Sequence, residues 1–77
     1  MGRKPIPKPS FLDDCDYLGF VHGERRWRSK NRRRLYTWDA LHGEVEAFTV
    51  RGRHLGAFDP VTKALIKQAV QGRTIDV

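Results

Sequence analysis

The sequence has little of what would cross-link a chain or anchor it in a membrane. It has 77 residues and a single cysteine, Cys15, so an internal disulfide is excluded. No apolar run approaches the roughly 18 residues of a membrane-spanning helix, and the basic N-terminus has no apolar stretch behind it that would make a secretory signal. We therefore expect a protein that acts in the cytoplasm, or a piece cut from a longer chain, with no membrane partner.

Acidic residues are missing from the most basic part of the chain. Of the 15 lysines and arginines, seven lie between residues 25 and 34, where there is no aspartate or glutamate. The rest of the chain is nearly neutral, so the formal charge of +6 comes from this block. One interpretation is that this basic block is simply a solvated surface. If it binds a polyanion instead, an acidic protein is one possible partner. A nucleic acid is favoured as the partner, because the planar guanidinium group suits phosphates and the interleaved aromatic rings could stack on bases. The candidate contacts are Arg25, Arg26, Trp27, Arg28, Arg33 and Tyr36.

The length predicts one domain with a small core. Residues 1–9 hold three of the four prolines and predict an extended arm, which leaves residues 10–77 as a single domain. Ser10 is suited to an N-cap, acids follow it in the first turn, and Gly19 is a typical stop signal. These signals predict a short helix over residues 10–18.

Alternation of β-branched and aromatic residues with turn signals predicts strands at 33–39, 44–50 and 53–58. The second of these also has apolar residues at helical spacing, and periodicity alone leaves that alternative open. Residues 61–70 suit either a helical turn or a strand, and residues 73–77 predict a final edge strand. The expected fold class is α+β and mainly β, with a short N-terminal helix followed by an antiparallel sheet.

A cluster of acids and one histidine follows the basic block. The segment WDALHGEVEAF places Asp39, His42, Glu44 and Glu46 within eight residues. A hairpin turn near His42 and Gly43 would bring Asp39 opposite Glu46, with His42 at the mouth. Cleavage of RNA needs a base for the 2′-hydroxyl, an acid for the leaving oxygen and cations for the charge on phosphorus. The cluster predicts Glu46 as the base and His42 as the acid or a phosphate contact.

The same cluster has plainer interpretations. A histidine beside two acids is commonly a surface ion pair. His42 and Glu46 could also begin a metal site, completed by His54, His22 or Cys15, but the chain has neither a CxxC nor an HExxH motif. We therefore predict no metal and no cofactor. A noncatalytic RNA-binding or ribosome-associated protein remains the alternative from a different functional class.

Three segments in the same order, YTWDALHGEVEAF, GRHLGAFDPVTK and QGRTI, resemble the cytotoxic ribonuclease domain of the E-group colicins, which cleave ribosomal RNA. The resemblance extends upstream through RRWRSKNRRRLY and covers roughly residues 25 to 77. It implies a strongly twisted antiparallel sheet behind a helical N-terminal element. The first 24 residues match poorly, and the hairpin from Glu44 to His54 is one residue shorter than in the colicins.

The resemblance assigns roles residue by residue. It implies that the catalytic groups fall on Asp39, His42, Glu46 and Arg73, with Glu46 taking the 2′-hydroxyl proton. It also implies that Arg25 holds the substrate and that His54 is auxiliary.

The resemblance further implies metal-independent cleavage of 16S ribosomal RNA at the decoding centre, with a 2′,3′-cyclic phosphate product. The implied partners are the ribosome and an acidic immunity or antitoxin protein. We expect action in the cytoplasm, either after delivery from a producing cell as part of a larger secreted toxin or as a freestanding toxin inside its own cell. A substrate of transfer or messenger RNA stays open, because arginines that hold a backbone do not identify the RNA.

Overall fold

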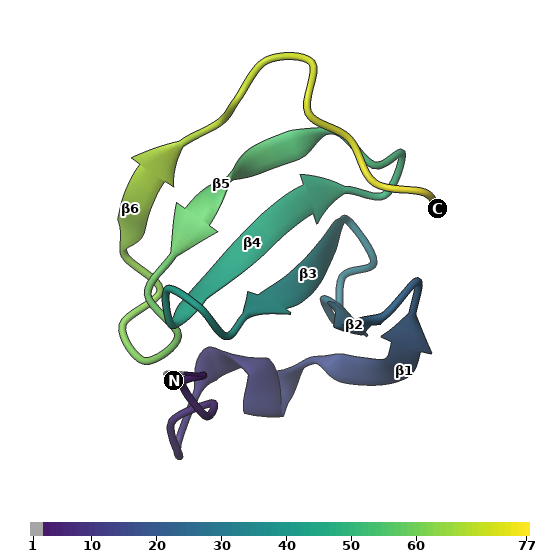
Figure 1. The fold of residues 1–77 in the computed structure, drawn as a ribbon. Helices are drawn as coiled ribbons and strands as arrows, with labels where there is room; N and C mark the ends of the chain where they lie inside the picture. Colours follow the sequence, from purple (N-terminus) through teal and green to yellow (C-terminus); the bar gives the residue numbers. More distant parts are fainter. Residues whose placement is uncertain (1–2) are drawn as a thin grey trace.

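The computed structural model describes residues 3–77 and consists mainly of one antiparallel sheet (Figure 1). Its six strands follow one another in sequence order, and each pairs with the next. Short turns suffice for such a meander, whose edges are the first and last strands. The strands are β1 (Asp16–Val21), β2 (Glu24–Arg28), β3 (Arg34–Asp39), β4 (Glu44–Thr49), β5 (His54–Phe58) and β6 (Leu65–Gln68).

The predicted N-terminal helix is wrong in type and in length. Only a 3-10 helix, η1 (Phe11–Asp14), is present, and Ser10 caps it as expected. The Ser10 hydroxyl accepts from the Leu12 N–H, while the Asp13 carboxylate accepts from the Ser10 N–H. Residues 16–18 instead belong to β1, where Tyr17 pairs with Trp27 of β2. Local capping signals could not reveal this strand, because its hydrogen-bond partners lie about ten residues further along the chain.

The other strand predictions had mixed outcomes. The strands predicted around 33–39, 44–50 and 53–58 are confirmed as β3, β4 and β5, so the helical alternative for the second is wrong. Residues 65–68 of the ambiguous segment form β6. The predicted final strand at 73–77 is wrong, since only an isolated bridge joins Thr74 to Arg53. The C-terminal segment is nevertheless tied to the sheet, because the His54 N–H donates to the Arg73 carbonyl and the Ile75 N–H donates to the Gly52 carbonyl.

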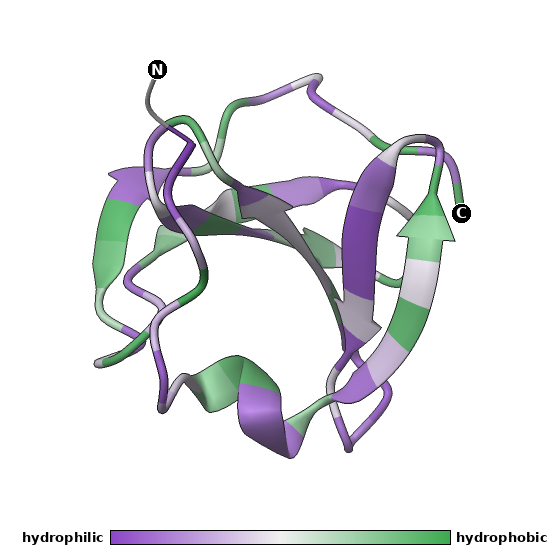
Figure 2. Cartoon of the chain, turned by 60° about the horizontal axis from the view of Figure 1, so that its bottom comes forward, coloured by the Kyte–Doolittle hydropathy of each residue, from purple (hydrophilic) through white to green (hydrophobic). Residues whose placement is uncertain are grey.

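The two faces of the sheet have different chemistry. Along β4, Val45 and Ala47 point into the hydrophobic core, whereas Glu44 and Glu46 alternate with them and point to the other face. The sheet twists and curls, and η1 lies below it in Figure 2. Burial of apolar area on the core face is the main stabilising term for a chain of this size. The buried core cluster consists of Leu12, Trp27, Tyr36, Val45 and Ala47.

The described part of the N-terminal arm lies against the turn between β3 and β4. The Lys4 N–H donates to the Ala40 carbonyl at 2.7 Å, and the Trp38 indole N–H donates to the Lys4 carbonyl at 3.1 Å. Ile6 packs against the core cluster. Residues 1 and 2 of the predicted arm lie outside the described residues. Within residues 3–77, no helix is long and apolar enough to cross a membrane.

Candidate active site

The polar face of the sheet carries the acids that the sequence singled out. The register between β3 and β4 pairs Asp39 with Glu44 and Thr37 with Glu46. The predicted pairing of Asp39 with Glu46 is therefore wrong by two residues, because the turn is centred one residue earlier than expected. A shift of two residues keeps side chains on the same face, so Asp39, Glu44 and Glu46 still share it.

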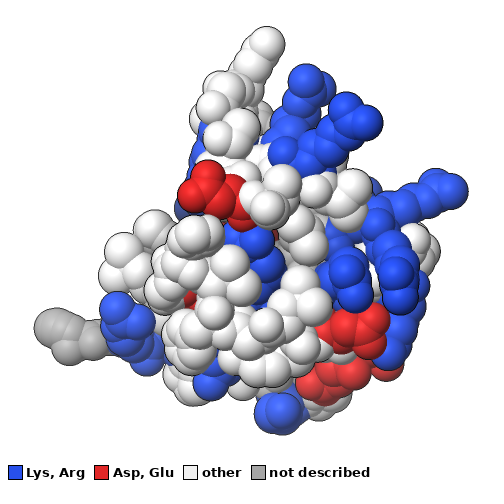
Figure 3. Space-filling view, turned by 90° about the vertical axis from the view of Figure 1, so that its right-hand side faces the viewer, with Lys and Arg blue, Asp and Glu red and all other residues white. Residues whose placement is uncertain are grey.

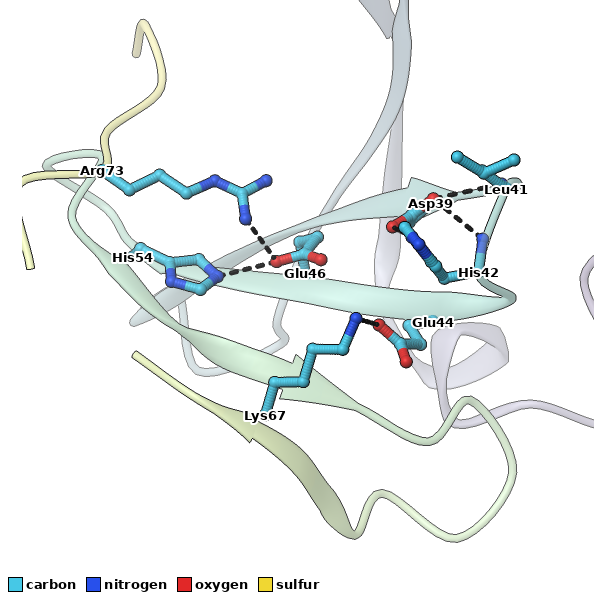
Figure 4. A network of polar contacts seen from close by, with 8 residues as sticks. All are labelled: Asp39, Leu41, His42, Glu44, Glu46, His54, Lys67 and Arg73. Carbon is cyan, nitrogen blue, oxygen red and sulfur yellow. Dashed lines mark hydrogen bonds and ion pairs between the residues drawn. The ribbon is translucent and has the colours of Figure 1, made fainter. Parts of the chain in front are cut away.

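Asp39 organises the turn that presents His42. One carboxylate oxygen, Oδ1, accepts from the backbone N–H groups of Leu41 and His42, and the other, Oδ2, lies 2.8 Å from His42 Nδ1 (Figure 4). Burial alone would raise the pKa of Asp39, but the hydrogen bonds from the side chain and N–H of His42 outweigh it, so the pKa is lowered. The ionised carboxylate fixes the Nδ1–H form of His42, whose Nε2 is then left for a substrate.

Glu46 is held by two donors on one oxygen. Its Oε1 lies 2.7 Å from His54 Nε2 and 3.2 Å from Arg73 Nη1 (Figure 4). Both Glu46 and His54 are buried, with 6% and 3% of their surfaces exposed. A carboxylate this deeply buried is tolerated because it is paired and hydrogen-bonded. The two donors fix the direction of the carboxylate on the polar face.

His54 is held in a single tautomer. Its Nδ1 accepts the backbone N–H of Val70 at 2.9 Å, so Nδ1 carries no proton. The ring hydrogen is therefore on Nε2 and donates to Glu46. His54 thus joins the C-terminal segment, which also carries Arg73, to the carboxylate of Glu46. In this position His54 orients Glu46 and is not itself placed to accept a proton.

Glu44 is the second buried carboxylate of β4, with 8% of its surface exposed. Its Oε1 is 3.2 Å from Lys67 Nζ, an ion-pair distance, although the geometry forms no hydrogen bond. Among the described residues, Asp39, His42 and Glu44 are the three that could together hold a metal ion, with donor atoms within 4.8 Å of one another. His54, His22 and Cys15, the other predicted ligand candidates, do not belong to this group.

A hollow of about 590 Å³ brings the predicted catalytic residues together. Asp39 enters it from the end of β3 and His42 from the turn that follows, while Glu46 comes from β4, Arg73 from the C-terminal segment and Arg25 from β2. We call it the first hollow. Carboxylates that can take a proton, an imidazole that can give one and the guanidinium groups of Arg25 and Arg73 thus face the same space. This is the set of groups that phosphodiester cleavage by the 2′-hydroxyl needs.

The basic block is only partly placed as predicted. Trp27 and Tyr36 are 7% and 2% exposed and belong to the core, so base stacking on them, the reason for selecting them, has no support. Arg25 and Arg33 are exposed, while Arg26 is buried on the polar face, with its Nε among the described atoms that lack a hydrogen-bond partner. Lys and Arg side chains project from much of the face in Figure 3.

Sequence reasoning missed several residues that line the first hollow or lie beside it. Phe20 and Leu41 line it and are 71% and 70% exposed. Arg3, from the arm, also lines it. Lys67 lies on the same face of the sheet as Glu46, because Glu46 pairs with Ala57 of β5 and Ala57 pairs with Lys67 of β6. The exposed aromatic in β1 could have been found only if residues 16–21 had been recognised as a strand.

Comparisons with known proteins match this chain to one family model and to several relatives. A family model described as "Cytotoxic" matches residues 20–76. The chain is similar to cloacin from Escherichia coli, with 46% identity over 43 residues, or 54% of this chain, and to colicin E3 from Escherichia coli, with 43% identity over 44 residues, or 56% of this chain. Colicin-E6 from the same organism is 42% identical over 43 residues, or 54% of this chain. In each case the match covers 8% of the relative.

Proposed function

Because this chain belongs to the Cytotoxic family, the ribonuclease domains of the E-group colicins, we propose that it is a toxin that cleaves ribosomal RNA. We place the cut in the 16S RNA of the small subunit, at the decoding centre, so that translation stops. The observation that carries the proposal is the meeting of Asp39, His42, Glu46 and Arg73 on one hollow. In this proposal residues 10–77 form the ribonuclease domain and residues 1–9 an arm.

The chemistry is acid and base catalysis. The free oxygen of Glu46 takes the proton of the 2′-hydroxyl, whose oxygen attacks the adjacent phosphorus. His42 acts in its imidazolium form: oriented by Asp39 through Nδ1, it gives the second ring proton, on Nε2, to the departing 5′-oxygen. Arg73 and Arg25 offset the charge that builds on the phosphate. The bond from phosphorus to the 5′-oxygen breaks, which leaves a 2′,3′-cyclic phosphate without a metal ion.

The proposed partners follow from the same reasoning. The ribosome supplies the RNA, and an acidic immunity or antitoxin protein protects the producing cell. The similarity to colicin E3 and cloacin supports delivery as part of a larger toxin that acts in the cytoplasm of the target cell.

The test uses intact bacterial ribosomes in EDTA. The wild-type protein and Glu46→Gln are incubated with them, and new ends on the small-subunit RNA are mapped by primer extension. We expect one cut at the decoding centre with the wild type and none with Glu46→Gln. Asp14→Asn, which changes an exposed acid of η1, is the charge-matched control and should cut like the wild type.

Two results would count against the proposal. Cleavage by Glu46→Gln at the wild-type rate would remove Glu46 from its role as the base. If neither protein cut, although both folded and bound ribosomes, a noncatalytic RNA-binding function would be the better conclusion. Cuts in transfer or messenger RNA alone would keep the chemistry and change the substrate.

A further inference from the structure

Two large aromatic side chains are exposed on the edge strand β1. Tyr17 is 53% exposed and Phe20 is 71% exposed. The pairing of β1 with β2 shifts register between Tyr17 and Gly19, so that Tyr17 lies opposite Trp27 and Phe20 opposite Arg25. Trp27 and Arg25 are two residues apart and therefore share a face of β2. The bulge thus places both rings of β1 on one face, although they are three residues apart in sequence.

The two rings line two adjoining hollows. Phe20 lines the first hollow with the candidate catalytic residues. Tyr17 lines a second hollow, of about 660 Å³, between the arm and strands β2 and β3. Arg3, Arg25 and Trp38 line both hollows, so these residues form the boundary between them. An extended ligand that crossed the boundary at Arg25 would therefore pass directly from the ring of Tyr17 to the ring of Phe20.

The second hollow is suited to a negatively charged ligand with planar aromatic groups, such as a nucleic acid. Arg3, Lys4, Lys8 and Arg25 contribute cations, and Asp13 is the acid among its lining residues. The Asp13 carboxylate already accepts the Ser10 N–H and lies 3.9 Å from Lys8 Nζ. Tyr17 is the exposed aromatic ring among these lining residues. Cations beside an exposed ring are typical of sites that bind single-stranded nucleic acid by stacking and backbone contacts.

We propose that β1 is a stacking track for unpaired RNA that leads into the first hollow. One base stacks on Tyr17, a neighbouring base stacks on Phe20, and the phosphate between them binds Arg25. Two residues along β2 span roughly 7 Å, a distance that one extended nucleotide step covers. The proposal rests on the proposed function and adds to it a substrate that is single-stranded beside the cut. Tyr17 and the arm lie before residue 20, where the family match begins.

The test measures binding in the Glu46→Gln background, so that RNA is not consumed. Short single-stranded oligonucleotides with 2-aminopurine at each position in turn report stacking through quenched fluorescence. Tyr17→Leu and Phe20→Leu keep apolar bulk but remove the ring face, and each should weaken binding about tenfold and remove quenching at one position. Tyr17→Phe and Phe20→Tyr keep the rings and should restore both signals.

Val61→Ala is the control for loss of an exposed apolar side chain away from β1. Val61 is 54% exposed and follows β5, and its truncation should leave RNA affinity unchanged. Unchanged affinity and quenching in both leucine variants would overturn the track. So would leucine variants that keep their RNA affinity but lose self-association, because the rings would then belong to an interface between copies of the chain.

The outcomes separate this proposal from the proposed function. Intact cleavage of ribosomal RNA with unaffected binding in the leucine variants would remove the track and leave the ribonuclease standing. Failure of the wild type to cleave any RNA, with ring-dependent binding intact, would remove the ribonuclease and leave the track as an RNA-binding surface.

Discussion

At the scale of single residues, His54 connects Glu46 to the C-terminal segment. Its Nε2–H donates to the Glu46 carboxylate, and its Nδ1 accepts the Val70 N–H. Proton transfer to a catalytic base slows when the base is displaced from the hydroxyl group, and a shift of about 1 Å can cost about a hundredfold in rate. In the proposed reaction His54 is therefore a positioning residue, whose effect on cleavage would pass through Glu46.

Two amide substitutions can separate the two contacts of His54. Asparagine places its oxygen near the position of Nδ1 and so keeps the contact with Val70, whereas glutamine places its NH₂ near Nε2 and so keeps the contact with Glu46. We expect His54→Asn to lower kcat about tenfold to a hundredfold with little change in KM. His54→Gln should retain much more activity. Single-turnover cleavage of ribosomes, with folding checked by circular dichroism, measures the difference.

The positioning role is tested by which of the two variants has the higher kcat. Equal loss in both would indicate that His54 matters only for packing. Wild-type kcat in His54→Asn would show that Arg73 alone orients Glu46.

At the scale of elements, the turn between β4 and β5 anchors the C-terminal segment. Gly52, at φ +90°, accepts the Ile75 N–H, and a Cβ at this position would meet the Ile75 carbonyl oxygen at 2.3 Å. Such a contact cannot form without movement of the backbone. Arg73 lies two residues before Ile75, so displacement of the segment would also withdraw one donor from Glu46.

Gly52→Ala should therefore damage both stability and the site. The left-handed conformation alone costs an alanine about 1 kcal/mol, or roughly 4 to 8 °C of melting temperature in a domain of this size. Gly23→Ala is the matched control, because Gly23 has φ +82° and nothing lies within 4 Å of its added Cβ. We expect a larger fall in melting temperature for Gly52→Ala, with faster proteolysis after residue 70. Equal falls would mean that the contact with Ile75 contributes nothing.

At the scale of the whole molecule, positive charge is unevenly placed with respect to the first hollow. Arg25 lines this hollow, whereas Arg51 lies in the turn at the opposite end of β4. Both are exposed. A net charge of +6 attracts RNA to the whole surface. Only a side chain that contacts a phosphate in the complex releases counterions from the RNA and so adds to the salt dependence of the affinity.

Salt dependence should distinguish local contacts from general attraction. Arg25→Gln should reduce the slope of log affinity against log salt by about one and weaken binding across RNA sequences. Arg51→Gln removes the same charge and should leave the slope nearly unchanged. The measurement is RNA affinity in the Glu46→Gln background between 50 and 200 mM salt. Equal changes in slope would contradict a phosphate contact at Arg25, and a loss confined to one RNA sequence would indicate base recognition.

Local chemistry made much of the fold predictable. Ser10 and Asp13 carry a capping signal within four residues, and β3, β4 and β5 are short segments rich in β-branched and aromatic residues between turn signals. The helix over residues 10–18 and the strand at 73–77 were wrong because their backbone partners are distant in sequence. Edge pairing of β1 with β2 and anchoring of the tail by Gly52 depend on the assembled sheet.

The sequence by itself determined the chemical groups of the candidate site. The two-residue alternation of β4 puts Glu44 and Glu46 on one face, and the cluster WDALHGEVEAF keeps Asp39 and His42 within reach of each other, because both properties are local. Tertiary structure decided the rest. It set the register that pairs Asp39 with Glu44, buried Trp27 and Tyr36 in the core, and exposed the rings of β1. Each of these depends on which distant strand supplies hydrogen bonds and apolar contact, and one segment alone contains neither.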